Sequence, residues 1–315
     1  MSSGPDLDAL LRFALDPAVV PPEVESVETW WDATTAHRAR WELPVDRAFA
    51  GGVAADRLGF AFAGGYAEAL RALVPGLVGI SALCATEQGG NHPRAIRTTV
   101  TPASPGHYTL TGHKRWATLA SAASSLLVVA STGLDATGKN RLRVVRVPTT
   151  APGVTLLPAS VPFVPEIPHA EVVLEQVRVT DADLLPGDGY DAYLKPFRTL
   201  EDLHVHAALA GYLVGVARRR GFPRELLEQL LAVAIATRAL AAADTTAATT
   251  HLALAGLLDL VTRIVVDVER VWAASPDAEH ARWQRDRALL QVAGKARTAR
   301  RERARLAASG PPDLP

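Results

Sequence analysis

The sequence predicts a multidomain α+β protein with an N-terminal α-helical domain (residues 1–80), a middle antiparallel β-barrel or sandwich domain (81–190) and a C-terminal helical bundle (191–310). Before residue 80 and after residue 190, apolar residues recur at intervals of three and four, as on one face of a helix. Between these limits the interval is two, which is typical of strands. The 315 residues fit roughly two to three domains, and a hydrophobic content of 48% is enough for large buried cores.

The N-terminal domain is expected to contain helical segments at 6–15, 23–41 and 57–74, each with apolar residues on one face. Two glycine pairs interrupt this part of the chain. The pair at 51–52 indicates a helix break, and the pair at 64–65 indicates a place where another backbone comes close.

The middle domain is expected to be antiparallel because short apolar, β-branched runs alternate with Pro, Gly, Asp and Asn turns. These runs are 126–129, 142–147, 154–157 and 172–179. The turn at 135–140, between the first two runs, predicts a hairpin.

The last part of the chain is expected to form long helices joined by short links, an arrangement typical of a bundle. The helical patterns are 200–219, 225–243, 251–274 and 280–306. We expect the bundle to serve as a homo-oligomer interface, giving a homodimer or homotetramer. The tail from Pro311 to Pro315 is expected to be disordered.

Charge and cysteine content exclude some classes of partner. Lys plus Arg equals Asp plus Glu at 33 each, so no overall field attracts polyanions or an anionic membrane surface. The single cysteine, Cys84, excludes an intramolecular disulfide and fits a reducing compartment. Neither a secretory signal pattern nor a run of about 18 apolar residues is found, so we expect a cytoplasmic protein without membrane contact.

Two motifs lie between Leu83 and Thr118: Thr86-Glu87-x-Gly89 and Lys114-x-Trp116-x-Thr118. In this order they resemble the middle β-domain of the acyl-CoA dehydrogenase and acyl-CoA oxidase superfamily, in which helices, a β-domain and a helical bundle also follow one another. The chain is similar to a divergent, shortened member of this superfamily.

The resemblance implies FAD as cofactor. It places Thr86 at the flavin edge, Trp116 over the isoalloxazine ring and Thr118 toward N5, and a flavin that accepts a hydride needs such donors and apolar cover. Without the motif, these residues would be ordinary core residues. Where the family has Gly-Ser or Gly-Thr, this chain has Asn91-His92; His92 either donates to the flavin pyrophosphate or thioester, or belongs to a surface loop.

The resemblance also implies Glu201 as the catalytic base, because it lies ten residues before Gly211, where some branches of the family carry this glutamate. The alternative is that Thr199 caps a helix and that Glu201 and Asp202 lie in its first turn. Other branches place the base after an Arg-Asp pair near the last helix. Here Arg285-Asp286 is followed by no such glutamate.

For the adenine and pyrophosphate end of FAD, the resemblance implies Arg219 and Gln229. Three adjacent arginines are equally typical of a helix C-terminus, where cations are favourable. His204 and His206 are two residues apart on a helix and do not form a metal pair, so no metal is expected. The basic stretch 295–305 is either a solvated helix face or a surface for phosphates of nucleic acid or CoA.

Two functions from different classes are consistent with the sequence. The first is an FAD-dependent oxidoreductase, an acyl-CoA dehydrogenase-like flavoprotein acting at the α and β carbons of an acyl-CoA or acyl-carrier thioester. The second is a binding or scaffold protein of the same fold that has lost the base or FAD and contacts nucleic acid through its last helix. The motifs favour the first, and the sequence does not indicate the electron acceptor.

Overall fold

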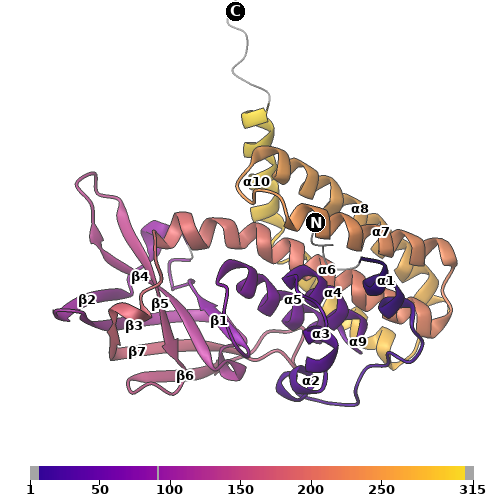
Figure 1. Ribbon diagram of the computed structural model, residues 1–315, viewed down its shortest axis with the longest axis horizontal. Coiled ribbons are helices and arrows are strands. Elements are labelled where there is room, and N and C mark those ends of the chain that lie inside the picture. The colour runs from indigo at the N-terminus through magenta and orange to yellow at the C-terminus, as the bar shows by residue number, and fades with distance from the viewer. Residues whose placement is uncertain (1–6, 91, 309–315) are drawn as a thin grey trace, which may run out of the picture. The chain divides into compact units, whose positions relative to one another are not determined.

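The computed structural model describes residues 7–90 and 92–308, which belong to two compact units (Figure 1). One unit contains residues up to 72 and from 199 onward, and the other contains 73–198. The division into three domains at residues 80 and 190 stays a prediction, as does the expected disorder of the tail, which lies outside the described residues. In the described ranges, no helix combines the length and the apolar character needed to span a membrane.

The N-terminal segment is helical as predicted. Its helices are α1 (Leu7–Leu15), α2 (Val27–Ala33), α3 (Thr35–Ala39), α4 (Pro44–Val53) and α5 (Leu58–Leu73). α2 begins at an N-cap serine, Ser26, whose hydroxyl accepts a hydrogen bond from the Thr29 N–H.

The C-terminal segment contains four long helices and one short one. They are α6 (Lys195–Arg220), α7 (Arg224–Ala241), α8 (Ala248–Ala273), α9 (Ala278–Asp286) and α10 (Gly294–Ala308). The continuous helix expected over 280–306 is interrupted between α9 and α10, where Arg287–Gln291 forms a 3-10 turn.

Glycines bring α4 and α5 into backbone contact with α6. A Cβ at Gly52 would lie 2.0 Å from the Ala208 carbonyl oxygen, and one at Gly65 would lie 2.7 Å from the Val205 Cα. The prediction of close backbone approach at 64–65 is therefore confirmed. The predicted break at 51–52 is wrong, because both glycines lie inside α4, where the missing side chain lets Gly52 pack directly on α6.

The unit formed by residues 73–198 contains a seven-stranded sheet in the order β1-β4-β2-β3-β7-β6, with β5 also paired to β4. Its strands are β1 (Ser81–Cys84), β2 (Thr99–Ser104), β3 (His107–Thr118), β4 (Ser125–Leu134), β5 (Asn140–Pro148), β6 (Val154–Ala159) and β7 (His169–Thr180). β3 and β7 lie side by side over most of their length (Figure 1). The hairpin predicted at 135–140 is confirmed, since it joins the antiparallel strands β4 and β5.

The sheet is mixed, not purely antiparallel as expected. β1 pairs in parallel with β4, with Ser81 opposite Ser125, and β2 makes one parallel pairing with β4 at Thr99 and Ser131. Both strands reach β4 through long connections instead of tight turns, so the antiparallel direction of a hairpin is not imposed on them.

α6 begins earlier than predicted. Asp188 caps a π-helical turn at Gly189–Leu194 by accepting from the Tyr190 and Asp191 N–H groups, and α6 follows directly from Lys195. Thr199 therefore lies inside α6 and is not its N-cap. The alternative role of Glu201, as a charge in the first turn of a helix, required Thr199 to be the N-cap. Glu201 lies in the second turn of α6, beyond the strongest influence of the helix dipole.

Candidate functional site

The two motifs of the middle segment meet through a buried ion pair. Glu87 Oε1 lies 2.6 Å from Lys114 Nζ, and both side chains are buried. Lys114 also donates to the Val129 carbonyl at 2.6 Å, and the Glu87 carboxylate accepts from the N–H groups of Arg97 and Thr98. Burial alone would raise the pKa of Glu87, but the hydrogen bond and charge of Lys114 and these N–H groups outweigh it, so the pKa lies below its usual value.

This ion pair fixes the residues on either side of it. Thr86 precedes Glu87, and its carbonyl accepts a 2.8 Å hydrogen bond from the Arg115 N–H, the residue between Lys114 and Trp116. The segment just after β1 and the last third of β3 are thus joined at adjacent positions. Thr86 is half-buried, as is Thr118 at the end of β3. The structure therefore brings Thr86, Trp116 and Thr118 into one region of the sheet.

Trp116 is unusual in both backbone and exposure. Its φ is +56°, a left-handed conformation that costs on the order of 1–3 kcal/mol in a non-glycine residue. The strain coincides with a bulge in the β3–β7 pairing between Lys114 and Ala117. The residue as a whole is 50% exposed. A strained strand that presents a half-exposed indole beside two threonines is suited to cover a flat apolar ring.

His92 contributes to a loop instead of pointing into the sheet. Its Nδ1 accepts from the Arg94 N–H at 3.2 Å and caps a 3-10 turn at Pro93–Ala95. The side chain is exposed, and Asn91 lies outside the described residues. The structure assigns His92 a capping role, and its expected contact with a pyrophosphate or thioester stays a prediction.

Glu201 and Asp202 differ in environment although they are neighbours in α6. Asp202 is 5% exposed and pairs with Arg297 at 2.8 Å and Arg300 at 2.5 Å, both from α10. Burial would raise the pKa of Asp202, but the charges of these two arginines hold it below its usual value. Glu201 is half-buried. Asp202 therefore has a structural role, as the charged partner of two arginines. Its neighbour Glu201 is the residue that the resemblance implies as the catalytic base.

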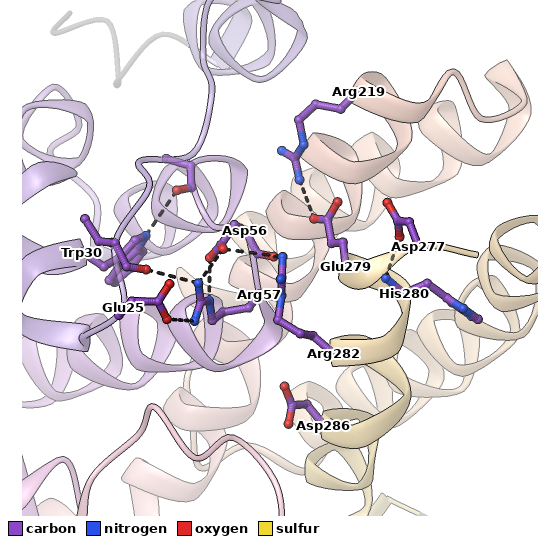
Figure 2. A network of polar contacts seen from close by, with 12 residues as sticks. Glu25, Trp30, Asp56, Arg57, Arg219, Asp277, Glu279, His280, Arg282 and Asp286 are labelled. Atoms are coloured by element: carbon purple, nitrogen blue, oxygen red, sulfur yellow. Dashed lines mark hydrogen bonds and ion pairs between the residues drawn. The ribbon is translucent and has the colours of Figure 1, made fainter. Parts of the chain in front are cut away.

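Arg219 lies near the C-terminal end of α6, 18 residues after Glu201, which corresponds to about 27 Å along a helix. Its guanidinium donates to Glu279 of α9 at 2.8 Å (Figure 2). Gln229 is exposed on α7. The structure does not bring Arg219 next to Glu201.

The other two arginines of this helix end are also engaged. Arg218 donates to carbonyls of the N-terminal segment, at Ala14 among others, and Arg220 pairs with Asp277. Figure 2 shows the same pattern nearby, where Asp56 lies between the guanidiniums of Arg57 and Arg282. The three arginines at the end of α6 thus bond to other elements of their own unit. This agrees with the alternative interpretation, in which they belong to a helix C-terminus and have a structural role.

The basic stretch 295–305 is largely neutralised inside its own unit. Besides the two arginines bound to Asp202, Arg301 pairs with Asp259 at 2.9 Å and Arg305 with Glu302 at 2.8 Å. Four of the six basic side chains of this helix are thus bonded to carboxylates, which makes it a poor surface for nucleic acid, because phosphate contacts at these four would replace existing ion pairs.

His204 and His206 are both buried in α6, and burial lowers the pKa of each to about 4. The Nδ1 of each ring lies 2.7 Å from the carbonyl four residues earlier, Leu200 for His204 and Asp202 for His206. Both rings are therefore neutral at neutral pH. They belong to the packing of α6.

Sequence reasoning missed the Glu87–Lys114 ion pair. The signal was present, because Glu87 directly follows Thr86 and Lys114 lies two residues before Trp116. A carboxylate and an ammonium in two otherwise apolar strand ends must be paired if both are buried.

Comparison with known proteins agrees with this geometry. Residues 82–177 match the family described as acyl-CoA dehydrogenase, middle domain. A curated relative, the probable acyl-CoA dehydrogenase YngJ of Bacillus subtilis (strain 168), is 34% identical over 134 residues, which are 42% of this chain and 33% of the relative. The match thus spans about a third of the length of this curated relative.

Two solved structures share the fold of nearly the whole chain. Butyryl-CoA dehydrogenase from Megasphaera elsdenii superimposes with a TM-score of 0.70 at 15% identity, over 95% of this chain and 98% of the other. FMN-bound TdsC from Paenibacillus sp. A11-2 gives a TM-score of 0.66 at 18% identity, over 92% of this chain and 95% of the other. At these identities the two structures show a common fold.

Proposed function

We propose that this chain, a divergent relative of the acyl-CoA dehydrogenases with their fold and their middle domain, is an FAD-dependent oxidoreductase that dehydrogenates an acyl thioester at its α and β carbons. The observation that carries the proposal is the half-exposed, backbone-strained Trp116 between two half-buried threonines.

The residues of the sheet fit an isoalloxazine ring. Trp116 offers apolar cover, and the hydroxyls of Thr86 and Thr118 can donate to the polar edge of a flavin. Bound FAD would supply the hydride acceptor. The Glu87–Lys114 ion pair would hold the two strand ends in register, so that these three side chains are positioned before the cofactor arrives.

For the adenosine end the fit is incomplete. Arg219 already bonds Glu279, so holding a pyrophosphate would require it to exchange this partner. Gln229 is exposed and available. Arg219 and Gln229 are both proposed contacts of this end of the cofactor. Because FMN lacks the adenosine end, a preference for FAD over FMN requires that Arg219 or Gln229 contributes to binding.

Glu201 is the proposed general base, which takes the α-proton of the thioester. A carboxylate matched to this weak acid needs a pKa raised toward the working pH by desolvation. The neighbouring Asp202 is neutralised by two arginines, so it adds little negative field of its own. In this proposal the chain acts as a homodimer or homotetramer on acyl-CoA or acyl-carrier thioesters.

The scaffold alternative has less support. Its nucleic-acid contact depended on the basic stretch 295–305, whose arginines at 297, 300, 301 and 305 are paired with carboxylates. A scaffold protein that has lost FAD would have no ligand for which the backbone strain at Trp116 is useful.

Flavin content separates the two functions. Purified protein, incubated with excess FAD and freed of unbound cofactor, should retain the visible flavin absorbance. Protein that stays colourless after this treatment would contradict the oxidoreductase proposal and favour the scaffold. Light scattering of the same sample tests the oligomer, which a monomeric mass would exclude.

A further inference from the structure

The strained backbone at Trp116 lies opposite one residue of the neighbouring strand. The pairing of β3 with β7 shifts its register between Lys114 and Ala117. Two residues of β3, Arg115 and Trp116, therefore lie opposite a single residue of β7, Glu171. Two residues opposite one are the defining feature of a β-bulge, a device that re-aims a side chain. The side chain re-aimed here is the one that the proposed function places over the flavin.

The Glu171 carboxylate bonds to two side chains of β3. Its Oε1 lies 3.0 Å from Arg115 Nε and 2.9 Å from Arg115 Nη2, and its Oε2 lies 2.7 Å from His113 Nε2. The hydrogen bond from Arg115 has the largest effect on the pKa of Glu171, and together with His113 it holds this pKa below its usual value although desolvation opposes it. Glu171 is therefore a carboxylate at neutral pH and can keep both partners.

These contacts and the buried ion pair together anchor the segment that precedes Trp116. Lys114 lies between His113 and Arg115, and neighbouring side chains of a strand point to opposite faces. Its ammonium bonds Glu87 in the interior. Three consecutive residues of β3 are thus each bonded to a glutamate. The next residue, Trp116, is the one whose backbone is left-handed.

The left-handed backbone at Trp116 persists only if its surroundings impose it, because this conformation is unfavourable for a tryptophan. The preceding residue, Arg115, is fixed twice: its N–H donates to the Thr86 carbonyl at 2.8 Å, and its guanidinium bonds to Glu171. Without the second contact the backbone at residues 115–116 could relax. The direction of the indole would then change with it.

We propose that Glu171 is a positioning residue, which holds the Trp116 indole in the orientation that covers the isoalloxazine ring of the flavin. This rests on the proposed function, because it concerns the cofactor of that same site. Glu171 acts through Arg115 and the backbone of the bulge, and it makes no contact with the ring itself.

The first test uses the FAD-free protein. All six tryptophans lie in the described ranges, and five of them are at most 7% exposed, whereas Trp116 is 50% exposed. Quenching of tryptophan fluorescence by acrylamide therefore reports mainly on Trp116, and Trp116→Phe should remove most of the quenchable signal. We expect Glu171→Ala to shift the quenching constant, and we expect this shift to be absent in the Trp116→Phe background.

The second test is the affinity for FAD, measured by fluorescence titration in a double-mutant cycle. Glu171→Ala should weaken FAD binding about three- to tenfold, the range expected for the loss of partly exposed ion pairs. In the Trp116→Ala background the same substitution should have no further effect, because the ring through which Glu171 acts is absent. A general destabilisation of the sheet would weaken binding equally in both backgrounds.

Glu175→Ala is the matched control, since Glu175 is exposed on the same strand and its loss changes the net charge equally. It should leave both the quenching and the FAD affinity as in wild type. Arg115→Met removes the same contact from the β3 side and should reproduce the effects of Glu171→Ala, so it provides the test if that variant does not fold. Thermal unfolding of each variant, without cofactor, verifies the fold.

The proposal is overturned if Glu171→Ala leaves the quenching unchanged, or if it weakens FAD binding as much without the Trp116 ring as with it. Wild type and Glu171→Ala that bind FAD equally well would also overturn it and would leave the proposed function intact. A wild-type protein that never retains FAD would contradict the proposed function. A quenching shift in that protein would still show that Glu171 sets the orientation of Trp116, but for another ligand than FAD.

Discussion

Replacing Lys114 by methionine should strongly destabilise the unit of residues 73–198. Lys114 is fully buried and is bonded to Glu87 and to the Val129 carbonyl, both at 2.6 Å. Lys114→Met keeps most of the volume but leaves the Glu87 carboxylate, 7% exposed, without a counter-charge. Removing one partner of a buried ion pair costs about 3–5 kcal/mol. Since a whole domain is stabilised by about 5–15 kcal/mol, this is a large part of the total.

The assay is urea unfolding at neutral pH, followed by far-ultraviolet circular dichroism. The double variant Lys114→Met with Glu87→Gln is the control, because replacing both charges by neutral groups of similar size is often close to neutral in stability. We expect it to recover at least half of the loss. A single variant that loses less than about 1 kcal/mol, or a double variant no more stable than the single one, would show that the buried ion pair does not stabilise this unit as described.

Three further predictions follow from the packing and titration of named residues. Trp116→Ala should weaken FAD binding by about 1.5–3 kcal/mol while Trp116→Phe retains most of it, as measured by fluorescence titration; equal affinity of all three proteins would contradict the assigned ring cover. Gly65→Val should destabilise by about 1–3 kcal/mol or more in thermal unfolding because its Cβ meets the α6 backbone, whereas Gly256→Ala, in open space on α8, should be neutral or stabilising. Stability should fall as the pH drops from about 6.5 to about 4. In this pH range His204 and His206 become protonated in the unfolded chain but stay neutral in the folded chain, where the pKa of each is about 4. A His204→Gln variant whose stability changes with pH as steeply as that of wild type would contradict this.

Periodicity was enough to predict the class of each segment, but not the neighbours of each strand. The change from intervals of three and four to intervals of two located the β-segment, and the turn chemistry at 135–140 located its hairpin. Nothing in β1 indicates that it pairs in parallel with β4, because a buried strand has the same apolar pattern in either direction. The mixed sheet therefore required tertiary information.

Glycine pairs illustrate the same limit. Gly65 was predicted to meet another backbone, and it does so at α6. Gly52 has the same role, but the sequence favoured a helix break because glycine lowers helix propensity. Tertiary packing of α4 against α6 outweighs this local preference.

Side-chain partners were the hardest feature to predict. Thr86, Trp116 and Thr118 were found from motif order, and their proximity follows from the sheet. Arg219 is implied by the family resemblance alone, and that resemblance carries no information on Glu279, which lies 60 residues further along the chain. Ion pairs between distant segments decide which charged residues are available to a ligand.

Anaerobic reduction of the FAD-loaded protein with saturated acyl-CoA thioesters of increasing chain length tests the proposed reaction. We expect at least one thioester to bleach the visible flavin band, and we expect Glu201→Gln to retain FAD but to bleach at least roughly 10²-fold more slowly. Glu228→Gln, on the exposed face of α7, should bleach as wild type does. A protein that holds FAD but is bleached by no thioester would contradict the proposed reaction, and equal rates for Glu201→Gln and wild type would contradict the proposed base.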